Sequence, residues 1–262
     1  MVVRTRAALV IAGSDSGGGA GIQADTWALR DLGVYAATAI TAITAQDTRG
    51  VWRVDPLPPE AVVAQIAAVL GDLDVAVVKI GMVGSARLTI AIADALARVV
   101  GEVPIVLDPV MIATSGHRLL DEDAIGALVQ RLVPMATVLT PNHPEAVALA
   151  GGVDVAAWAA SVGRPVLVTG GDVEGEEIVD RLVVGDRTRE WRGPRIAGGP
   201  FHGTGCTLAS AVAAGLARGA ALEDAVDVGI AYVRARLRAA IRPGHGSAVG
   251  GPVTTPWSAT ML

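Results

Sequence analysis

The chain has little cysteine, lysine or aromatic residue, and each shortage excludes something. Cys206 is the only cysteine among 262 residues, so no internal disulfide can form, and we expect a reducing, cytoplasmic compartment. Aromatic residues make up 3% of the chain, so the core must be built from alanine, valine, leucine and isoleucine. Lys79 is the only lysine, and Ile80 follows it, which excludes a P-loop, where serine or threonine follows the lysine.

An excess of positive charge and long apolar runs are absent as well. The net charge of −5 at pH 7 argues against nucleic acid or an anionic membrane surface as the main partner. No stretch reaches the ~18 uncharged apolar residues that a membrane-spanning helix needs. Asp94 and Arg98, for example, interrupt residues 88–100. We therefore expect neither a nucleic-acid partner nor a membrane partner.

Short apolar segments alternate with helical ones along most of the chain. Strands are expected at 7–12, 37–45, 75–80, 105–107, 138–140 and 166–168, with a hairpin over 178–191. Helices are expected at 21–32, 58–70, 85–99, 121–132, 144–150, 155–161, 207–218 and 222–237. Continuous apolar strands between helices indicate a mainly parallel sheet covered on both faces, a three-layer α/β/α fold. We expect one domain over residues 1–262, with a loop-rich tail from residue 243.

In such sheets, ligands bind beyond the carboxyl ends of the strands, so polar residues at those ends are candidates for a site. They are residues 14–15, 46–47, 81–82, Asp108, Asn142 and 169–171. Asp108 follows a strand and Glu145 begins a helix, and together these two carboxylates are suited to Mg²⁺. Glu145 alone has a simpler explanation, because an acid at a helix start complements the helix dipole.

Two glycine-rich segments favour anion binding. Residues 13–21 hold five glycines between a strand and a helix, which suits a loop that closes over a small substrate, although a flexible connection is the simpler alternative. The match of residues 19–24 to the dinucleotide fingerprint is weak, because Gln46 stands where an acid is expected. Residues 201–208 place glycines and Cys206 at a helix start, where free N–H groups bind phosphate and lower the pKa of a thiol. A tight turn with Cys206 in the core remains the alternative.

Phosphoryl transfer needs a phosphate cradle, a metal ion and a base, and these residues offer all three. Cys206 is the candidate base if its pKa is lowered. A covalent thiol nucleophile would instead need a histidine partner, and His202 is the only nearby candidate.

Six segments, in this order and spacing, resemble the hydroxymethylpyrimidine (phosphate) kinases of thiamine biosynthesis, which belong to the ribokinase-like superfamily. The segments are 13–25, 44–48, 79–82, 107–111, 140–146 and 202–207, and the resemblance runs from about residue 7 to residue 240. The Gly-Thr-Gly-Cys sequence at 203–206 distinguishes this group from sugar kinases, which carry aspartate in place of the cysteine. The resemblance implies a ribokinase-like fold, ATP and Mg²⁺ as cofactors, and a homodimer. It also implies phosphorylation of 4-amino-5-hydroxymethyl-2-methylpyrimidine, then of its monophosphate.

The resemblance also implies roles for individual residues. Substrate contacts fall to Gly13, Asp25, Gln46 and Met82, with Gln46 on the aminopyrimidine edge and Met82 on the ring. Cys206 becomes the general base, and the N–H groups of Gly203, Thr204, Gly205 and Cys206 form the anion hole. Nucleotide and phosphate contacts fall to Asp108, Asn142, Thr169 and Gly171, and Mg²⁺ to Asp108 and Glu145.

Two departures from the family pattern keep alternatives open. Thr169 stands where the family usually has a lysine thought to contact nucleotide phosphates, and an arginine is the candidate substitute for that charge, although the sequence does not identify which one. The family's Gly-His-Gly-Pro-Val ending is altered after Gly246. A pyridoxal or pyridoxine kinase is one alternative function. A weakly catalytic, pyrimidine-binding regulatory protein is the other, and Thr169 motivates it.

Overall fold

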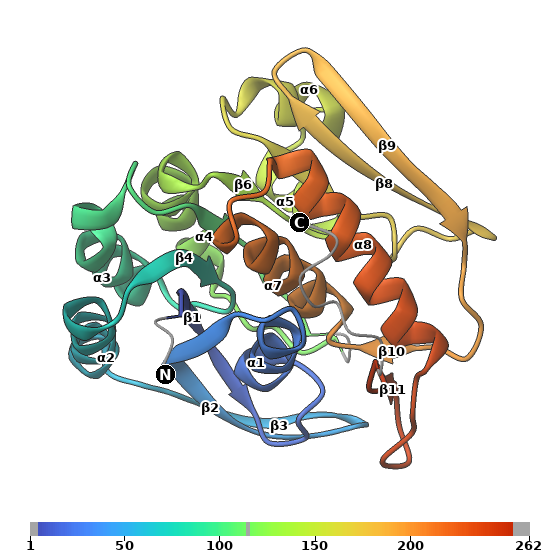
Figure 1. The fold of residues 1–262 in the computed structure, drawn as a ribbon, viewed down its shortest axis with the longest axis horizontal. Coiled ribbons are helices and arrows are strands. Elements are labelled where there is room, and N and C mark those ends of the chain that lie inside the picture. Colours follow the sequence, from blue (N-terminus) through green and yellow to red (C-terminus); the bar gives the residue numbers. More distant parts are fainter. Residues whose placement is uncertain (1–4, 114–115, 254–262) are drawn as a thin grey trace.

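The computed structural model describes residues 5–113 and 116–253, which form a nine-stranded sheet with helices on both faces (Figure 1). The strands are β1 (Ala7–Asp15), β2 (Tyr35–Asp47), β3 (Gly50–Pro56), β4 (Val75–Ile80), β5 (Ile105–Leu107), β6 (Val138–Leu139), β7 (Val166–Val168), β8 (Glu177–Val184), β9 (Arg187–Pro194), β10 (Phe201–His202) and β11 (Ala248–Val249). The helices are α1 (Gly21–Asp31), α2 (Pro59–Asp72), α3 (Ala86–Leu96), α4 (Glu122–Ala127), α5 (His143–Ala150), α6 (Val155–Ser161), α7 (Thr204–Ala217) and α8 (Leu222–Arg238). Short helical turns are η1 (Ala97–Val99), η2 (Leu128–Leu132) and η3 (Val133–Met135).

The central sheet has the order β3-β2-β1-β4-β5-β6-β7-β8-β9. Every pair from β2 to β7 is parallel, and the antiparallel pairs lie only at the two margins, where β3, β8 and β9 join. The expectation of a three-layer α/β/α fold with a mainly parallel sheet is therefore confirmed.

The apolar strands are buried on both faces, as their composition predicts. Along β1, Leu9 and Ile11 pack with residues of α2, α3 and α5, whereas Ala8 and Val10 pack with residues of α1, α7 and α8. Small side chains fill the contact between α7 and α8, in a core with few aromatic residues, and so the two helices lie close together. A Cβ on Gly215 would lie 2.7 Å from the Cβ of Ala225.

Two features differ from the expectations. β3 was not expected, because its side chains are mostly exposed and it lacks an apolar pattern. The segment from residue 243 is not wholly loop, because β11 pairs in parallel with β10 through Phe201–Ala248 and His202–Val249. Within the described part of the chain, no helix is both long and apolar enough to cross a membrane. Residues 254–262 of the expected tail lie outside the described residues.

Candidate active site

The carboxyl ends of the parallel strands and the start of α7 meet at one edge of the sheet. Gly203 lies between β10 and α7 and caps the start of α7 in a left-handed conformation, with φ of 79°. A Cβ at this position would lie 1.8 Å from the carbonyl oxygen of Gly19, so only glycine allows the two glycine-rich segments to touch. The two candidate anion-binding segments, 184 residues apart at this contact, therefore form one site.

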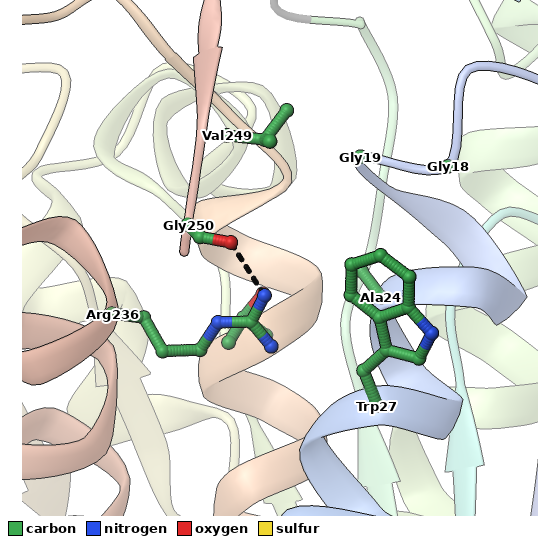
Figure 2. Close-up of a pocket in the computed structure, with 8 residues that line it drawn as sticks. Gly18, Gly19, Ala24, Trp27, Arg236, Val249 and Gly250 are labelled. Carbon is green, nitrogen blue, oxygen red and sulfur yellow. Dashed lines mark hydrogen bonds between the residues drawn. The ribbon is translucent and has the colours of Figure 1, made fainter. Parts of the chain in front are cut away.

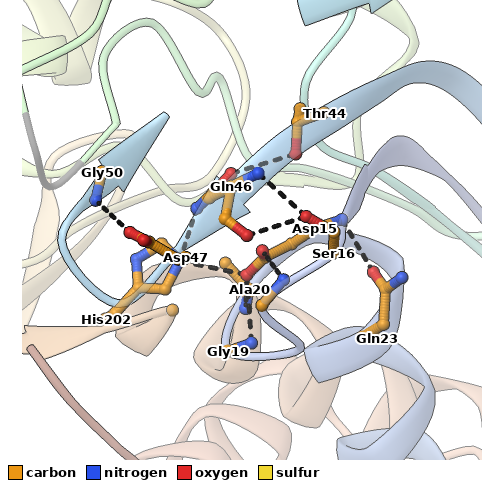
Figure 3. A network of polar contacts seen from close by, with 12 residues as sticks. Asp15, Ser16, Gly19, Ala20, Gln23, Thr44, Gln46, Asp47, Gly50 and His202 are labelled. Carbon is orange, nitrogen blue, oxygen red and sulfur yellow. Dashed lines mark hydrogen bonds and ion pairs between the residues drawn. The ribbon is translucent and has the colours of Figure 1, made fainter. Parts of the chain in front are cut away.

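Asp15 shapes the glycine loop after β1 (Figure 3). Its carboxylate accepts hydrogen bonds from the backbone N–H groups of Gly17 at 2.7 Å, Gly19 at 3.0 Å and Ala20 at 2.8 Å. Burial alone would raise the pKa of Asp15, but the hydrogen bond from His202 and those from Ala20 and Gly17 outweigh it and hold the pKa below its usual value. The loop is thus an ordered turn around an ionised carboxylate. The sequence marked Asp15 only as a polar strand end.

Gln46 and Met82 lie beside this loop, at the ends of β2 and β4, the two strands that flank β1. Gln46 is half-buried, and its side-chain amide contacts Thr44 and His202. Its backbone N–H and carbonyl both bind the hydroxyl of Ser16, which ties the loop to the end of β2. A Cβ on Gly13 would lie 2.9 Å from Sδ of Met82, so the structure brings Gly13 and Met82 together. Their contacts with a substrate remain predictions.

Lys79 is fully buried and carries the positive charge beneath the site. Its Nζ lies 3.0 Å from Oδ1 of Asp25 and 3.5 Å from Oδ2 of Asp108. Asp25 lies inside α1 rather than in the loop, has no exposed surface, and also accepts a hydrogen bond from Ser210 at 2.7 Å. Its role as a substrate ligand stays a prediction, since the carboxylate faces Lys79. The sequence analysis missed Lys79 as a site residue, although a lone lysine in an apolar strand was the available signal.

Cys206 lies in the first turn of α7, as expected, but the expected lowering of its pKa is wrong. Burial raises the pKa of the Cys206 thiol to about 12, and the charges of Asp108 and Asp25 add to this effect. The positive charge of Lys79 and the N–H group of Gly21 act in the opposite direction but do not compensate. The helix start alone cannot stabilise a thiolate beside two buried carboxyl groups. Cys206 is therefore a neutral thiol at neutral pH.

Asp108 and Glu145 are buried near one another. Burial and the charge of Asp108 raise the pKa of Glu145 to about 8. Asn142 and Glu145 form a reciprocal cap of α5, in which Glu145 accepts from the Asn142 N–H at 3.0 Å and Asn142 Oδ1 accepts from the Glu145 N–H at 2.8 Å. The simpler explanation of Glu145 as a helix cap therefore applies, but it does not explain Asp108, whose Oδ2 lies 3.5 Å from Nζ of Lys79 and accepts no hydrogen bond from the residues that the structure describes.

These two carboxylates fit a Mg²⁺ ion that is also held by phosphate oxygens, since Mg²⁺ sites with nucleotides commonly use one or two protein carboxylates. Among the described residues, no cluster of three or more histidine, cysteine or acidic side chains forms a complete metal site. A Mg²⁺ ion held by these two carboxylates would take its remaining ligands from phosphate oxygens and water.

Arg195 holds the loop that follows β7. Its guanidinium donates to the carbonyl oxygens of Gly171 at 2.8 Å and Gly175 at 2.7 Å, and also to that of Val173. Thr169 pairs with Asn142 in a parallel bridge at the start of this loop. The exposed charge of Arg195 thus contacts the loop that begins at Thr169, the position where the family resemblance implies a lysine.

Behind the glycine loop lies a cavity of about 10 Å³, room for about one water molecule and too small for a substrate (Figure 2). Arg236 lines it and donates to the carbonyl oxygen of Gly250 at 2.5 Å, and its guanidinium lies 5.6 Å from the ring centre of Trp27. Arg236 therefore holds the segment after β11 against α8, next to the glycine loop.

Comparisons with known proteins agree with this arrangement. The family model described as phosphomethylpyrimidine kinase matches residues 15–252. A hydroxymethylpyrimidine/phosphomethylpyrimidine kinase of Rhizobium meliloti is 48% identical over 91% of this chain and 92% of its own. The crystal structure of a Clostridium difficile phosphomethylpyrimidine kinase is 37% identical, with a TM-score of 0.76 over 87% of this chain and 98% of its own. A pyridoxal kinase of Bacillus subtilis, solved as an ADP complex, is 32% identical, with a TM-score of 0.85 over 94% of this chain and 97% of its own.

Replacing Lys79 by methionine should destabilise the protein strongly, because it leaves Asp25 and Asp108 buried without their counter-ion. Removing one partner of a buried ion pair costs about 3–5 kcal/mol, which corresponds to a fall in Tm of roughly 10 °C for a chain of this size. Thermal unfolding followed by circular dichroism measures the change. The double variant Lys79→Met with Asp25→Asn should recover part of the loss. A Tm of the single variant within about 2 °C of that of the unsubstituted protein would contradict the assignment of Lys79 as the buried counter-ion.

The raised pKa of Cys206 predicts slow alkylation that accelerates with pH. Because only the thiolate reacts, the rate with iodoacetamide should rise about tenfold per pH unit between pH 7 and pH 10 without levelling off. Intact-protein mass spectrometry follows the reaction directly, since the chain has one cysteine, and Cys206→Ser provides the unreactive control. A rate that levels off below pH 9 would mean that the thiol ionises much more easily than its surroundings imply.

Proposed function

Because the chain belongs to the phosphomethylpyrimidine kinase family and is a phosphotransferase, we propose that it transfers the γ-phosphoryl group of ATP to the 5-hydroxymethyl group of 4-amino-5-hydroxymethyl-2-methylpyrimidine. A second transfer, to the monophosphate, gives the diphosphate used in thiamine biosynthesis. The observation that carries this proposal is the junction of the start of α7 with the loop after β1. There the candidate anion hole lies beside Gln46, an amide that offers both a donor and an acceptor to an aminopyrimidine edge.

In this proposal, the N–H groups of Gly203, Thr204, Gly205 and Cys206 receive the transferring phosphoryl group at the positive end of α7. Cys206 acts as the base in its thiolate form and takes the proton of the acceptor hydroxyl, which regenerates the thiol. Because burial raises the pKa of this thiol, only a small fraction is thiolate at neutral pH, and transfer through a loose transition state, in which positioning and electrostatics dominate, demands little of the base. Lys79 supplies the positive charge that favours the thiolate when it forms.

Asp108 and Glu145 would hold Mg²⁺, which neutralises charge on the nucleotide phosphates when it is bound. Asn142, Thr169 and Gly171 line the neighbouring edge and are assigned to the nucleotide. The cytoplasm and a homodimer are the location and assembly that we expect. A pyridoxal or pyridoxine kinase is the second candidate function, because the fold also matches that of pyridoxal kinases. The regulatory alternative rests on Thr169 alone.

The first test is incubation with ATP, Mg²⁺ and the hydroxymethylpyrimidine, with products followed by mass spectrometry and with pyridoxine as a parallel substrate. We expect the pyrimidine monophosphate and then the diphosphate. Monophosphate alone would limit the function to the first step. Product from pyridoxine alone would establish the second candidate, and no product from either would favour a binding protein.

Arg195→Ala should weaken the use of ATP, because it removes the hydrogen bonds that hold residues 171–175 and the positive charge beside them. We expect the KM for ATP to rise roughly tenfold, the effect of losing one or two net hydrogen bonds, and the KM for the pyrimidine to change little. Arg195→Lys retains the charge but not the planar donor set, so it separates the two contributions. Equal KM values for ATP in all three proteins would remove Arg195 from nucleotide binding.

A further inference from the structure

Nε2 of His202 lies between Asp15, at the start of the glycine loop, and Gln46, at the end of β2. It is 2.7 Å from the side-chain amide of Gln46 and 3.1 Å from Oδ2 of Asp15 (Figure 3). The His202 side chain is 14% exposed and that of Asp15 is 3% exposed, so water cannot readily replace either partner. The protonation of Nε2 therefore decides how the Gln46 amide is arranged.

The imidazole has little freedom to avoid these contacts. His202 belongs to β10 and pairs with Val249 of β11. A Cβ on Gly19 would lie 2.8 Å from Cδ2 of His202 and 2.7 Å from Cγ1 of Val249, so the ring is enclosed between the glycine loop and β11. A ring held in this way can position another side chain.

Counting protons shows that one orientation of the Gln46 amide is unfavourable. With the amide nitrogen toward His202, Nε2 must accept a proton, and its lone pair then also faces the carboxylate of Asp15. In the same orientation, the single hydroxyl proton of Thr44 has two competing acceptors, the Ser14 carbonyl at 2.9 Å and Oε1 of Gln46 at 3.3 Å. At least two of these contacts would then lack a proton.

Turning the amide by half a turn gives every contact a donor, with the single Nε2 proton of His202 shared between two acceptors. Nε2–H of His202 then donates to Oε1 of Gln46 and to Asp15, Gln46 donates to the Thr44 oxygen, and Thr44 donates to Ser14. We propose that His202, with Nε2 protonated, is the positioning residue that fixes the Gln46 carbonyl oxygen on its own side and the amide nitrogen on the side of Thr44.

This proposal rests on the proposed function for its consequence. The fixed amide retains one free lone pair near His202 and one free N–H near Thr44. An aminopyrimidine can satisfy both only with its 4-amino group toward His202 and its ring nitrogen toward Thr44. The analogue with a 4-oxo group presents the opposite order of acceptor and donor, so in the same ring orientation it meets the fixed amide acceptor to acceptor and donor to donor. His202 therefore determines specificity without touching the reacting atoms.

Nitrogen-15 NMR of the imidazole side chains tests the arrangement in the free protein. The chain has four histidines, and the spectrum of His202→Gln identifies the His202 signals by their loss. We expect Nε2 of His202 to carry a proton at pH 7.5. An unprotonated Nε2 would overturn the proposal, whatever the protein phosphorylates.

Kinetics test the consequence. The ratio of kcat/KM for the aminopyrimidine to that for its 4-oxo analogue should fall at least tenfold in His202→Phe, because the Gln46 amide is free to turn. His202→Gln, whose side chain can still donate a proton, should keep most of the original ratio. An unchanged ratio in an active His202→Phe enzyme, or a preference for the 4-oxo analogue in the unsubstituted protein, would overturn the proposal. If no pyrimidine is phosphorylated, the proposed function fails, and the NMR result alone decides the arrangement of His202.

Discussion

The buried ion pair of Lys79 with Asp25 and Asp108 is the interaction on which the site depends. It joins β4, α1 and the end of β5, and a hydrogen bond from Ser210 adds α7. Each of these elements also carries a part of the site, so one ammonium group holds four parts of the site together. Its cost in desolvation is large, and replacement by apolar residues often stabilises a protein, which suggests that the charge is retained for what it does to its neighbours. Those neighbours include the thiol at the start of α7.

The site divides into two halves that use carboxylates differently. In the half with Asp15, hydrogen bonds from backbone amides and His202 keep the carboxylate ionised, and the loop takes its shape from it. In the half with Asp108 and Glu145, burial raises the pKa of both carboxyl groups, and the charge of Asp25 adds to this for Asp108 as the charge of Asp108 does for Glu145, so a cation would relieve an existing penalty. Asp15 therefore has its charge compensated within the protein, whereas Asp108 and Glu145 have a raised pKa that a bound cation would lower.

Much of the fold could be predicted from the sequence because the central strands are apolar throughout, and polar residues such as Gln46 and Asp108 mark their ends. β3 could not be predicted, because an exposed edge strand needs no apolar pattern. The partners of Lys79 are remote in sequence, and the contact between His202 and Gln46 spans 156 residues, so neither follows from local spacing. The prediction of a lowered pKa for Cys206 was wrong for a related reason. Proximity to a helix start is visible in the sequence, whereas the carboxyl groups brought beside it by folding are not.

The pairing of β10 with β11 has a consequence for the order in which the protein is made. His202 and the glycine turn at the start of α7 are synthesised before Ala248 and Val249, yet β11 encloses the histidine ring and Arg236 holds the segment that follows. Every strand of the central sheet has been synthesised by Pro194, more than fifty residues before β11. The surroundings of His202 can therefore be completed only after the whole central sheet is present in the nascent chain.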